Sequence, residues 1–359
     1  MARENNLDAV RLFAAILVVV GHAYLLTGAD APGFGGRPIH TLGVCIFFSL
    51  SGYLIAMSWQ RDPDMWRFLT RRALRILPAL VVVVLVTALL LGPAVTEMPA
   101  RDYFSSPDFF RYFLNLVLYV RLGLPGVFDD TPHPHVVNGS LWTLPVEFSL
   151  YLLLPSLFAL GWLWRVRNTP LPFLVAVTAL CAWAQLRFLH SGGRPPQHYI
   201  FGTEFWAAFD LAPYFLIGAC LAVMRAERLL HPLLAPAAVL AVLVLGRNQT
   251  SREAVLLLAV PVATLSIGLA RMPVTHLAGR YGDLSYGMYL WSFPVQQVLV
   301  DRFEVFGPRW NNLLPVLAIS GLLAFASWHL IEKQFLGLKP RPGGQRRVAA
   351  AESPAMAGD

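Results

Sequence analysis

The sequence predicts an all-α fold, a polytopic membrane bundle of about ten transmembrane helices. Of its 359 residues, 56% are hydrophobic and only 14% are charged. Its mean hydropathy is +0.56, and apolar runs recur from one end to the other. A run of about 20 apolar residues is long enough to cross a bilayer as a helix. Scarce charge and recurring long apolar runs are together typical of an integral membrane protein.

Ten apolar segments are long enough, or nearly long enough, to cross the membrane. They cover residues 7–27, 40–59, 75–95, 141–164, 171–189, 205–224, 232–247, 253–270, 283–301 and 312–335. A further stretch, Phe109 to Val120, is short and contains Arg111 and Asn115. We interpret that stretch as a re-entrant or surface helix, which keeps the expected number of spans at ten.

The distribution of basic residues predicts the orientation, because short loops rich in Arg and Lys stay in the cytoplasm. With ten spans, the main basic clusters all fall on one side of the membrane, together with both termini. These clusters are Arg61 to Arg72, Arg165 with Arg167, Arg225 with Arg228, Arg271 with Arg280, and Lys339 to Arg347. We therefore expect a protein of the cytoplasmic (inner) membrane with both termini in the cytoplasm.

Residues 1–338 are expected to form one membrane domain. Residues 339–359 are rich in Pro, Gly, Ala and Arg and lack apolar periodicity, which predicts a disordered cytoplasmic tail. The net charge of +7 comes mostly from arginines in loops, which indicates orientation in the membrane rather than nucleic-acid binding. The three cysteines lie singly in apolar segments, so neither a disulfide framework nor a metal site is implied.

Arg11 and His22 are two ionisable residues inside the first apolar segment. Eleven residues of α-helix turn by about 1100°, only ~20° from three full turns, and rise by about 16 Å. The two side chains therefore share one helix face, with Arg11 near the cytoplasmic end and His22 near the outer end. Ionisable residues in a membrane are costly unless they face protein, water or a ligand. A lone histidine is more often structural. The aligned arginine favours a helix face that lines a functional site, with His22 as a general base.

Small residues interrupt the second span between Phe47 and Leu54, at Ser49, Ser51 and Gly52. Such residues commonly allow two helices to pack closely. The same small residues would also leave room for a ligand path between the first two helices, so both interpretations remain open.

Arg72 and Arg75 lie three residues apart at the start of the third span and share a helix face. Arginines at such positions are commonly orientation signals. A guanidinium pair at the cytoplasmic mouth of a bundle also suits bidentate binding of phosphate groups.

Glu147 and Tyr151 are four residues apart in the fourth span, which opens with Ser140 and Trp142. A carboxylate within the membrane must be paired or protonated. Glu147 could orient His22 as an acid-base partner, or it could pair with an arginine such as Arg11. His133 and His135 lack a third metal ligand nearby in the sequence, so we assign them to a surface loop.

These motifs resemble those of the acyltransferase 3 family of integral membrane acyltransferases, and they follow the family order from about residue 5 to 335. One departure is Ser292, where many members have histidine. The shared motifs are Arg11 and His22 with ten residues between them, Phe47-Phe48-x-x-Ser51-Gly52, Arg72-x-x-Arg75 followed by Ile and Pro, Gly139-Ser-Leu-Trp142 with Glu147, and Ser285-Tyr-Gly-x-Tyr-Leu-Trp291.

The resemblance implies a membrane O-acyltransferase that moves an acyl group, usually acetyl from cytoplasmic acetyl-CoA, to a hydroxyl of a carbohydrate or glycolipid. No metal cofactor and no nucleic acid partner are expected, membrane lipids surround the protein, and the sequence is compatible with a homodimer. The expected roles are catalysis by His22 and Glu147, acyl-CoA binding by Arg11, Arg72 and Arg75, and substrate contacts by Ser51, Tyr53, Ser140, Trp142 and Tyr151. His22 would either deprotonate the acceptor hydroxyl or carry the acyl group transiently.

The competing interpretation is a proton-coupled transporter or flippase for a sugar or lipid intermediate, because intramembrane Arg, His and Glu also suit ion-coupled transport. The sequence contains no clear inverted repeat, and an arginine pair suited to phosphate has no obvious role in such a protein. A purely structural membrane protein fits the aligned ionisable residues less well still.

Overall fold

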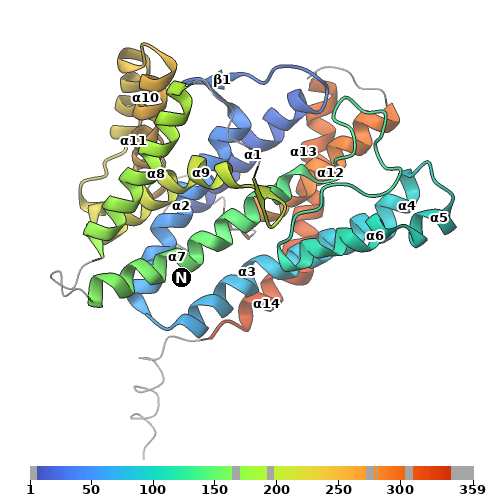
Figure 1. Cartoon of the computed structure of the whole chain (residues 1–359), viewed down its shortest axis with the longest axis horizontal. Coiled ribbons are helices and arrows are strands. Elements are labelled where there is room, and N and C mark those ends of the chain that lie inside the picture. The colour runs from blue at the N-terminus through green and yellow to red at the C-terminus, as the bar shows by residue number, and fades with distance from the viewer. Residues whose placement is uncertain are drawn as a thin grey trace, which may run out of the picture.

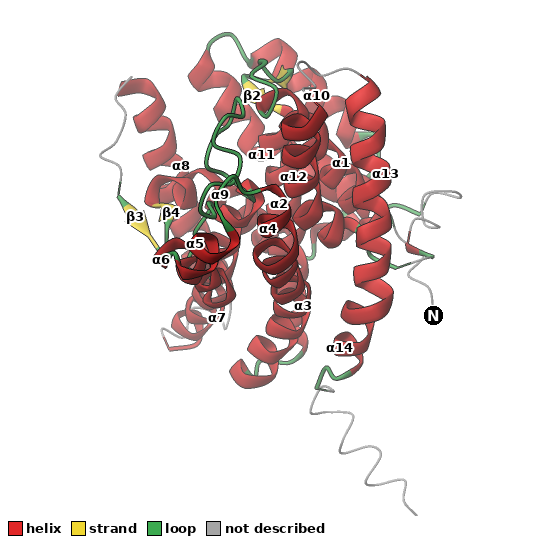
Figure 2. Cartoon of the chain, turned by 90° about the vertical axis from the view of Figure 1, so that its right-hand side faces the viewer, coloured by secondary structure: helices red, strands yellow, loops and turns green. Residues whose placement is uncertain are grey.

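The computed structural model describes residues 6–163, 170–191, 198–271, 279–280, 282–303 and 310–340. Most of the described chain is helical, and its strands are two short antiparallel pairs (Figures 1 and 2). The all-α membrane bundle predicted from the sequence is therefore confirmed. The expected disorder of the tail concerns residues that lie, apart from 339 and 340, outside the described part.

The first third of the described chain contains the helices that carry most of the predicted site. Helix α1 and helix α2 are joined by a small hairpin, and α3 continues into a π-helical turn and a short α-helix. The bounds are α1 Leu7–Leu25, β1 Gly33–Phe34, β2 Arg37–Pro38, α2 Ile39–Arg61, α3 Met65–Val86, η1 Thr87–Leu91 and α4 Gly92–Val95. Helix α1 packs against both α2 and α12, and α2 packs against α9.

Short helices precede α7, and longer ones complete the bundle. The bounds are α5 Ala100–Ser105, α6 Pro107–Tyr112, η2 Phe113–Val117, η3 Gly139–Trp142, α7 Thr143–Leu163, α8 Leu171–Ser191, β3 Tyr199–Ile200, β4 Thr203–Glu204, α9 Phe205–Val223, η4 Ala226–Arg228, α10 Leu234–Leu245, α11 Gln249–Gly268, α12 Ser285–Phe303, α13 Trp310–Ser327, η6 Trp328–Glu332 and α14 Lys333–Gly337.

Within the described residues, eight helices are long and apolar enough to cross a membrane. The predicted count of ten is not confirmed, because two of the ten expected segments do not meet these criteria. Helix α10 has only 12 residues. Helix α12 is long but less apolar, and its Gln296 and Gln297 side chains are fully buried.

The stretch from Phe109 to Val120 does not form a separate span. It is divided between α6 and η2 and ends where Leu118 adopts a left-handed backbone conformation, with φ of 60°. The stretch packs against α3 and η1. The Tyr112 hydroxyl donates to Thr87 Oγ1 at 3.4 Å, and from the preceding helix α5 the Tyr103 hydroxyl donates to the Ala88 carbonyl at 2.8 Å. This arrangement agrees with the interpretation as a re-entrant or surface segment.

Small residues bring α2 and α9 into close contact. A Cβ atom at Gly52 would overlap the carbonyl oxygen of Phe215, and one at Gly218 would overlap the carbonyl oxygen of Ser49. Gly52 therefore has the packing role that small residues commonly have between membrane helices. Ser51, its neighbour, faces a cavity instead, so the two interpretations of this motif apply to different residues.

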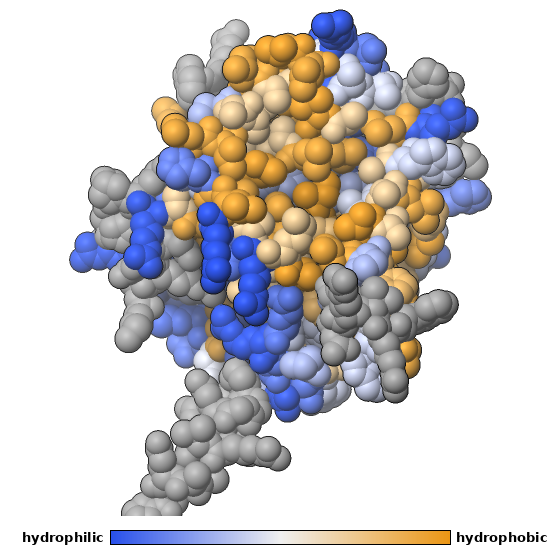
Figure 3. Space-filling model, turned by 90° about the vertical axis from the view of Figure 1, so that its left-hand side faces the viewer, coloured by the Kyte–Doolittle hydropathy of each residue, from blue (hydrophilic) through white to orange (hydrophobic). Residues whose placement is uncertain are grey.

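The side of the molecule on which α10 and α11 lie in Figure 1 carries a broad apolar surface (Figure 3). Leu240, Leu243, Val244 and Leu258 are all well exposed there. Exposed apolar surface of this extent is expected where side chains face lipid hydrocarbon rather than water.

Candidate active site

The predicted arginines and the predicted histidine lie toward different ends of the bundle. We call the end that holds Arg11, Arg72 and Arg75 the arginine end, and the end that holds His22 and His40 the histidine end. Helices α1 and α12 run side by side between the two ends. Arg11 bonds to Asp283, just before α12, and His22 lies against Phe293 in the middle of α12. The shared face predicted for Arg11 and His22 is thus the face that α1 presents to α12.

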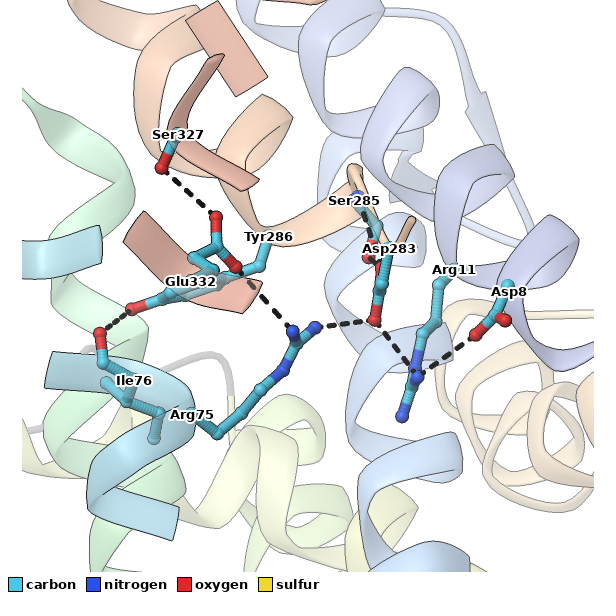
Figure 4. Close-up of polar contacts among 9 residues, drawn as sticks. All are labelled: Asp8, Arg11, Arg75, Ile76, Asp283, Ser285, Tyr286, Ser327 and Glu332. Carbon is cyan, nitrogen blue, oxygen red and sulfur yellow. Dashed lines mark hydrogen bonds and ion pairs between the residues drawn. The ribbon is translucent and has the colours of Figure 1, made fainter. Parts of the chain in front are cut away.

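At the arginine end, one carboxylate lies between two guanidinium groups (Figure 4). Asp283 Oδ2 accepts from Arg75 Nη2 at 2.5 Å and from Arg11 Nη1 at 3.1 Å. Arg11 also lies 3.4 Å from Asp8. Ser285 donates its hydroxyl to the other oxygen of Asp283 at 2.5 Å. These contacts fix Arg11 and Arg75 relative to each other, although they come from different helices.

Opposite charges determine the protonation state of Asp283. Burial alone raises the pKa of a carboxyl group, but the charges of Arg75 and Arg11 and the hydrogen bonds from Ser285 hold the pKa of Asp283 well below its usual range. Asp283 is therefore ionised at neutral pH and neutralises part of the positive charge around it.

Arg75 has a second acidic neighbour on the opposite side of its guanidinium group (Figure 4). Glu332 Oε2 lies 3.6 Å from Arg75 Nη1, and Ser327 donates to the other Glu332 oxygen at 3.1 Å. The Arg75 guanidinium also lies 5.7 Å from the ring centre of Tyr286. The π-helical turn η6 contains Glu332, so this irregular turn supplies the second carboxylate.

Arg72 differs from Arg11 and Arg75 because it has no described acidic partner. Its Nε atom is buried without a hydrogen-bond partner, and no described carboxylate lies within ion-pair distance of it. A guanidinium group that is partly buried and has no ion pair is unfavourable. Such a group is therefore a strong candidate for binding an anionic ligand.

A cleft of about 530 Å³ opens at the arginine end. Among the described residues, six basic side chains and three carboxylates line it, which leaves an excess of three positive charges. The basic residues are Arg11, Arg61, Arg71, Arg72, Arg75 and Lys339, and the acidic residues are Asp8, Asp62 and Asp283. This cleft can attract a ligand with several negative charges.

A narrower cavity of about 120 Å³ continues inward from this cleft. Arg11, Leu54, Arg72 and Arg75 line both spaces. Ser51, Glu147 and Tyr151 line the narrow cavity, and Thr143 and Tyr289 are also part of its wall. The predicted arginines and the predicted glutamate therefore meet in one continuous space.

Glu147 forms its hydrogen bonds within this cavity. Ser51 donates to Glu147 Oε1 at 3.0 Å, and the Tyr151 hydroxyl donates to the same oxygen. The Ser51 and Tyr151 hydroxyls lie 3.3 Å apart. Glu147 is therefore held by two hydroxyl groups and pairs neither with His22 nor with Arg11.

His22 lies in separate surroundings at the histidine end. Its ring centre is 5.1 Å from that of Phe293 and 5.6 Å from that of His40. His22 is 8% exposed, and its Nδ1 atom is buried without a hydrogen-bond partner. The ring of His133, outside the spans, packs against Phe293 at 6.2 Å, and burial lowers the pKa of His133.

Three other predicted substrate contacts lie away from the narrow cavity. Tyr53 is buried in the hydrophobic core beside α9. Ser140 is buried at the start of α7 and accepts the Tyr289 hydroxyl on its carbonyl oxygen at 2.9 Å. The Trp142 carbonyl accepts from Thr203 at 3.0 Å. In this structure, Ser51 and Tyr151 are the predicted substrate contacts that line the cavity.

Asp283 and Glu332 contact the predicted arginines, which the sequence indicated only weakly. Each lies in a polar motif at one end of an apolar segment and gives weak information when taken alone. The available signal was that Arg75, running into a membrane span, needs a compensating charge. Among the described residues, no three His, Cys, Asp or Glu side chains gather as potential metal ligands.

A family model described as an acyltransferase domain matches residues 4–332. The chain therefore belongs to the acyltransferase 3 family, and it is an acyltransferase that transfers groups other than aminoacyl groups. Membership of this family, together with the apolar helices, identifies it as an integral membrane enzyme. No solved structure matches the chain.

Several curated proteins are similar over most of the chain. An O-acetyl transferase of Shigella phage Sf6 is 29% identical, over 94% of this chain and 97% of that protein. Acyltransferase MdmB of Streptomyces mycarofaciens is 26% identical, over 99% of this chain and 96% of that protein. The peptidoglycan O-acetyltransferase OatA of Listeria monocytogenes is 26% identical, over 91% of this chain but only 55% of that protein.

Proposed function

We propose that this enzyme transfers an acetyl group from acetyl-CoA to a hydroxyl of a carbohydrate or glycolipid. The observation that carries the proposal is Arg72, a half-buried arginine with no ion pair to a described carboxylate, at the junction of a positively charged cleft and a narrow cavity. Coenzyme A has several phosphate charges at one end and a slender thiol arm at the other. A wide cationic opening that narrows inward has the complementary shape and charge.

In this proposal, the arginine end is cytoplasmic, as the basic loops indicate. The CoA phosphates bind at the cleft, with Arg72 as their principal ligand, because Arg11 and Arg75 already share Asp283. The thiol arm then extends into the narrow cavity toward Thr143 and Tyr289. The donor and acceptor would thus approach from opposite sides of the membrane.

We assign Glu147 to the donor cavity and His22 to the acceptor. Glu147 lies beside the path of the thiol arm, where Ser51 and Tyr151 fix its carboxylate. His22 takes the proton of the acceptor hydroxyl as a general base. The hydroxyl oxygen attacks the acetyl carbon, the carbon–sulfur bond breaks, and the proton passes to the sulfur of CoA.

The two parts of the site are close along α12. Tyr289 lines the donor cavity, and Phe293 contacts His22. These residues are four apart, so about one helical turn, or roughly 6 Å, separates them along the axis. The proposal therefore places the thioester about one turn of α12 away from the histidine.

The acceptor class is supported by the relatives. One of them is named a peptidoglycan O-acetyltransferase, and another an O-acetyl transferase. A hydroxyl of a cell-envelope carbohydrate or a lipid-linked sugar is therefore the acceptor we propose.

Purified protein in detergent or nanodiscs, given acetyl-CoA labelled in the acetyl group, tests the proposal. We expect CoA release that depends on the protein and transfer of label to a glycan acceptor, with both lost in His22→Ala. In cells that carry the gene, proton NMR of the surface polysaccharide should show O-acetyl signals that disappear with the same variant. A transporter would instead move its cargo without consuming acetyl-CoA, and that result would refute the proposal.

A further inference from the structure

His40, in the first turn of α2, packs its ring against the ring of His22. The two ring centres are 5.6 Å apart and the planes are tilted by 35°. The Nδ1 atoms of both rings are buried and have no hydrogen-bond partner among the described residues. Two unsatisfied buried nitrogens side by side carry a cost that a bound polar group would remove.

The absence of a side chain at Gly21 allows the contact between His22 and His40. A Cβ atom at Gly21 would lie 2.6 Å from His40 Cβ and 2.7 Å from His40 Nδ1. Any larger residue at position 21 would therefore push His40 away from His22. The residue next to His22 in the chain thus has to be a glycine for the two rings to meet.

A buried ionic network anchors the chain just before His40. Arg37, three residues earlier, donates from Nε to Glu253 at 2.7 Å and from Nη2 to Asp210 at 2.5 Å. Gln185 donates to both carboxylates at 2.9 Å. This network joins the hairpin before α2 to α8, α9 and α11, so it fixes the position at which α2 begins.

We propose that His40 is a second catalytic residue, which together with His22 brackets the acceptor hydroxyl. His40 donates its Nδ1 hydrogen to the hydroxyl oxygen, while His22 accepts the hydroxyl proton. The oxygen keeps a lone pair for attack on the acetyl carbon, the carbon–sulfur bond breaks, and the proton passes from His22 to the CoA sulfur. His40 thereby occupies the place next to His22 that Glu147 was expected to fill. This inference rests on the proposed function.

His40→Ala and His40→Asn test the proposal in the full-length protein with acetyl-CoA and a glycan acceptor. The alanine variant should lower kcat at least about 100-fold, the lower range for loss of a hydrogen-bond donor to the reacting oxygen, while the KM for acetyl-CoA stays within about twofold of the wild-type value. Asparagine places a polar atom close to the Nδ1 position, so it should recover at least about tenfold of the lost kcat. Added imidazole should partly restore the alanine variant.

A merely structural role predicts a different pattern. In that case both variants would lose kcat equally, imidazole would not help, and the thermal stability would fall with the activity. That pattern, or a kcat within about threefold of wild type in His40→Ala, would overturn the proposal. His231→Ala, in an exposed loop, is the matched control and should leave activity unchanged. An inactive wild-type protein would refute the proposed function instead.

If neither variant at position 40 folds, Gly21→Ala offers a second route, because it moves His40 without removing it. We expect acetyl-CoA binding to be retained and kcat to fall. Gly321→Ala, where the added Cβ would have Met288 Cε at 3.6 Å as its nearest neighbour, is the control. Normal kcat in folded Gly21→Ala would overturn the proposal.

Discussion

Asp283 and Arg75 form a 2.5 Å ion pair that joins the segment before α12 to α3. Arg11 of α1 reaches the same carboxylate oxygen at 3.1 Å. One acidic side chain therefore holds two guanidinium groups of the donor site in place and offsets their mutual repulsion.

We predict that Asp283→Asn destabilises the protein strongly. The substitution leaves two largely buried guanidinium groups facing each other, and removing one partner of a buried pair typically costs about 3–5 kcal/mol. Denaturant titration or thermal unfolding in detergent measures the loss. Asp108→Asn is the control, because the Asp108–Arg111 pair is exposed and such pairs contribute about 1 kcal/mol or less. Equal stability of wild type and Asp283→Asn would contradict the ion-pair arrangement.

The same residue predicts how stability depends on pH. The pKa of Asp283 is lower in the folded protein than in the unfolded chain, where it is about 3.9. Its stabilising contribution is therefore fully present above about pH 5 and is lost as the pH falls through the unfolded-state value toward the folded one. The difference in unfolding free energy between wild type and Asp283→Asn should be constant from pH 8 to about pH 5 and shrink in more acidic buffer. A difference that grows on acidification would have the wrong sign.

We predict that Arg72→Gln weakens donor binding. Unlike Arg11 and Arg75, Arg72 has no ion pair with a described carboxylate, and a hydrogen bond to a charged group contributes roughly 1.5–3 kcal/mol. The KM for acetyl-CoA should therefore rise about tenfold or more, with the stability unchanged or slightly increased. Arg111→Gln, at an exposed arginine, should leave KM within about twofold. Unchanged donor KM in Arg72→Gln would remove the main support for the donor site.

Tyr151→Phe tests whether the position of Glu147 matters for turnover. The substitution removes one of the two hydroxyl donors to Glu147 and leaves Ser51 as the other. We expect kcat to fall by roughly three- to tenfold, equivalent to about one hydrogen bond. Ser156→Ala is the control, since Ser156 is exposed on the same helix and bonds only to the Leu152 carbonyl. A kcat equal to the wild-type value would show that Tyr151 is dispensable.

Gly52→Ala tests the packing of α2 against α9. The new Cβ would overlap the carbonyl oxygen of Phe215, so the two helices would have to separate. Overpacking of this kind typically costs about 1–3 kcal/mol, and we expect a clear fall in thermal stability. Gly337→Ala, where no atom lies within 4 Å of the added Cβ, should have little effect. Matching stabilities of the two variants would argue against close packing at Gly52.

The sequence predicted the features that depend on local pattern. Apolar length indicated the helices, and helical periodicity placed Arg11 and His22 on one face, which the contacts with Asp283 and Phe293 confirm. Periodicity also placed Arg72 and Arg75 on one face of α3, where both line the same cleft and cavity. These properties depend on residues a few turns apart, so a single sequence contains them.

Contacts between distant segments could not be predicted in the same way. The spacing of four residues indicated that Tyr151 could reach Glu147, but nothing local indicates that Glu147 also bonds to Ser51 instead of His22. The sequence also did not show that Arg37 pairs with Asp210 and Glu253, although both carboxylates lie in apolar segments and need a compensating charge. Choosing among many candidate cations requires the helix packing, which a single sequence does not contain.

The excess of three positive charges around the cleft at the arginine end has a kinetic consequence. A polyanionic donor would be drawn toward this opening over about one Debye length, some 8 Å at physiological salt. Raising the ionic strength should slow capture of the donor more than it slows any later step. The rate at low donor concentration would therefore depend on salt, while the rate at saturation would not.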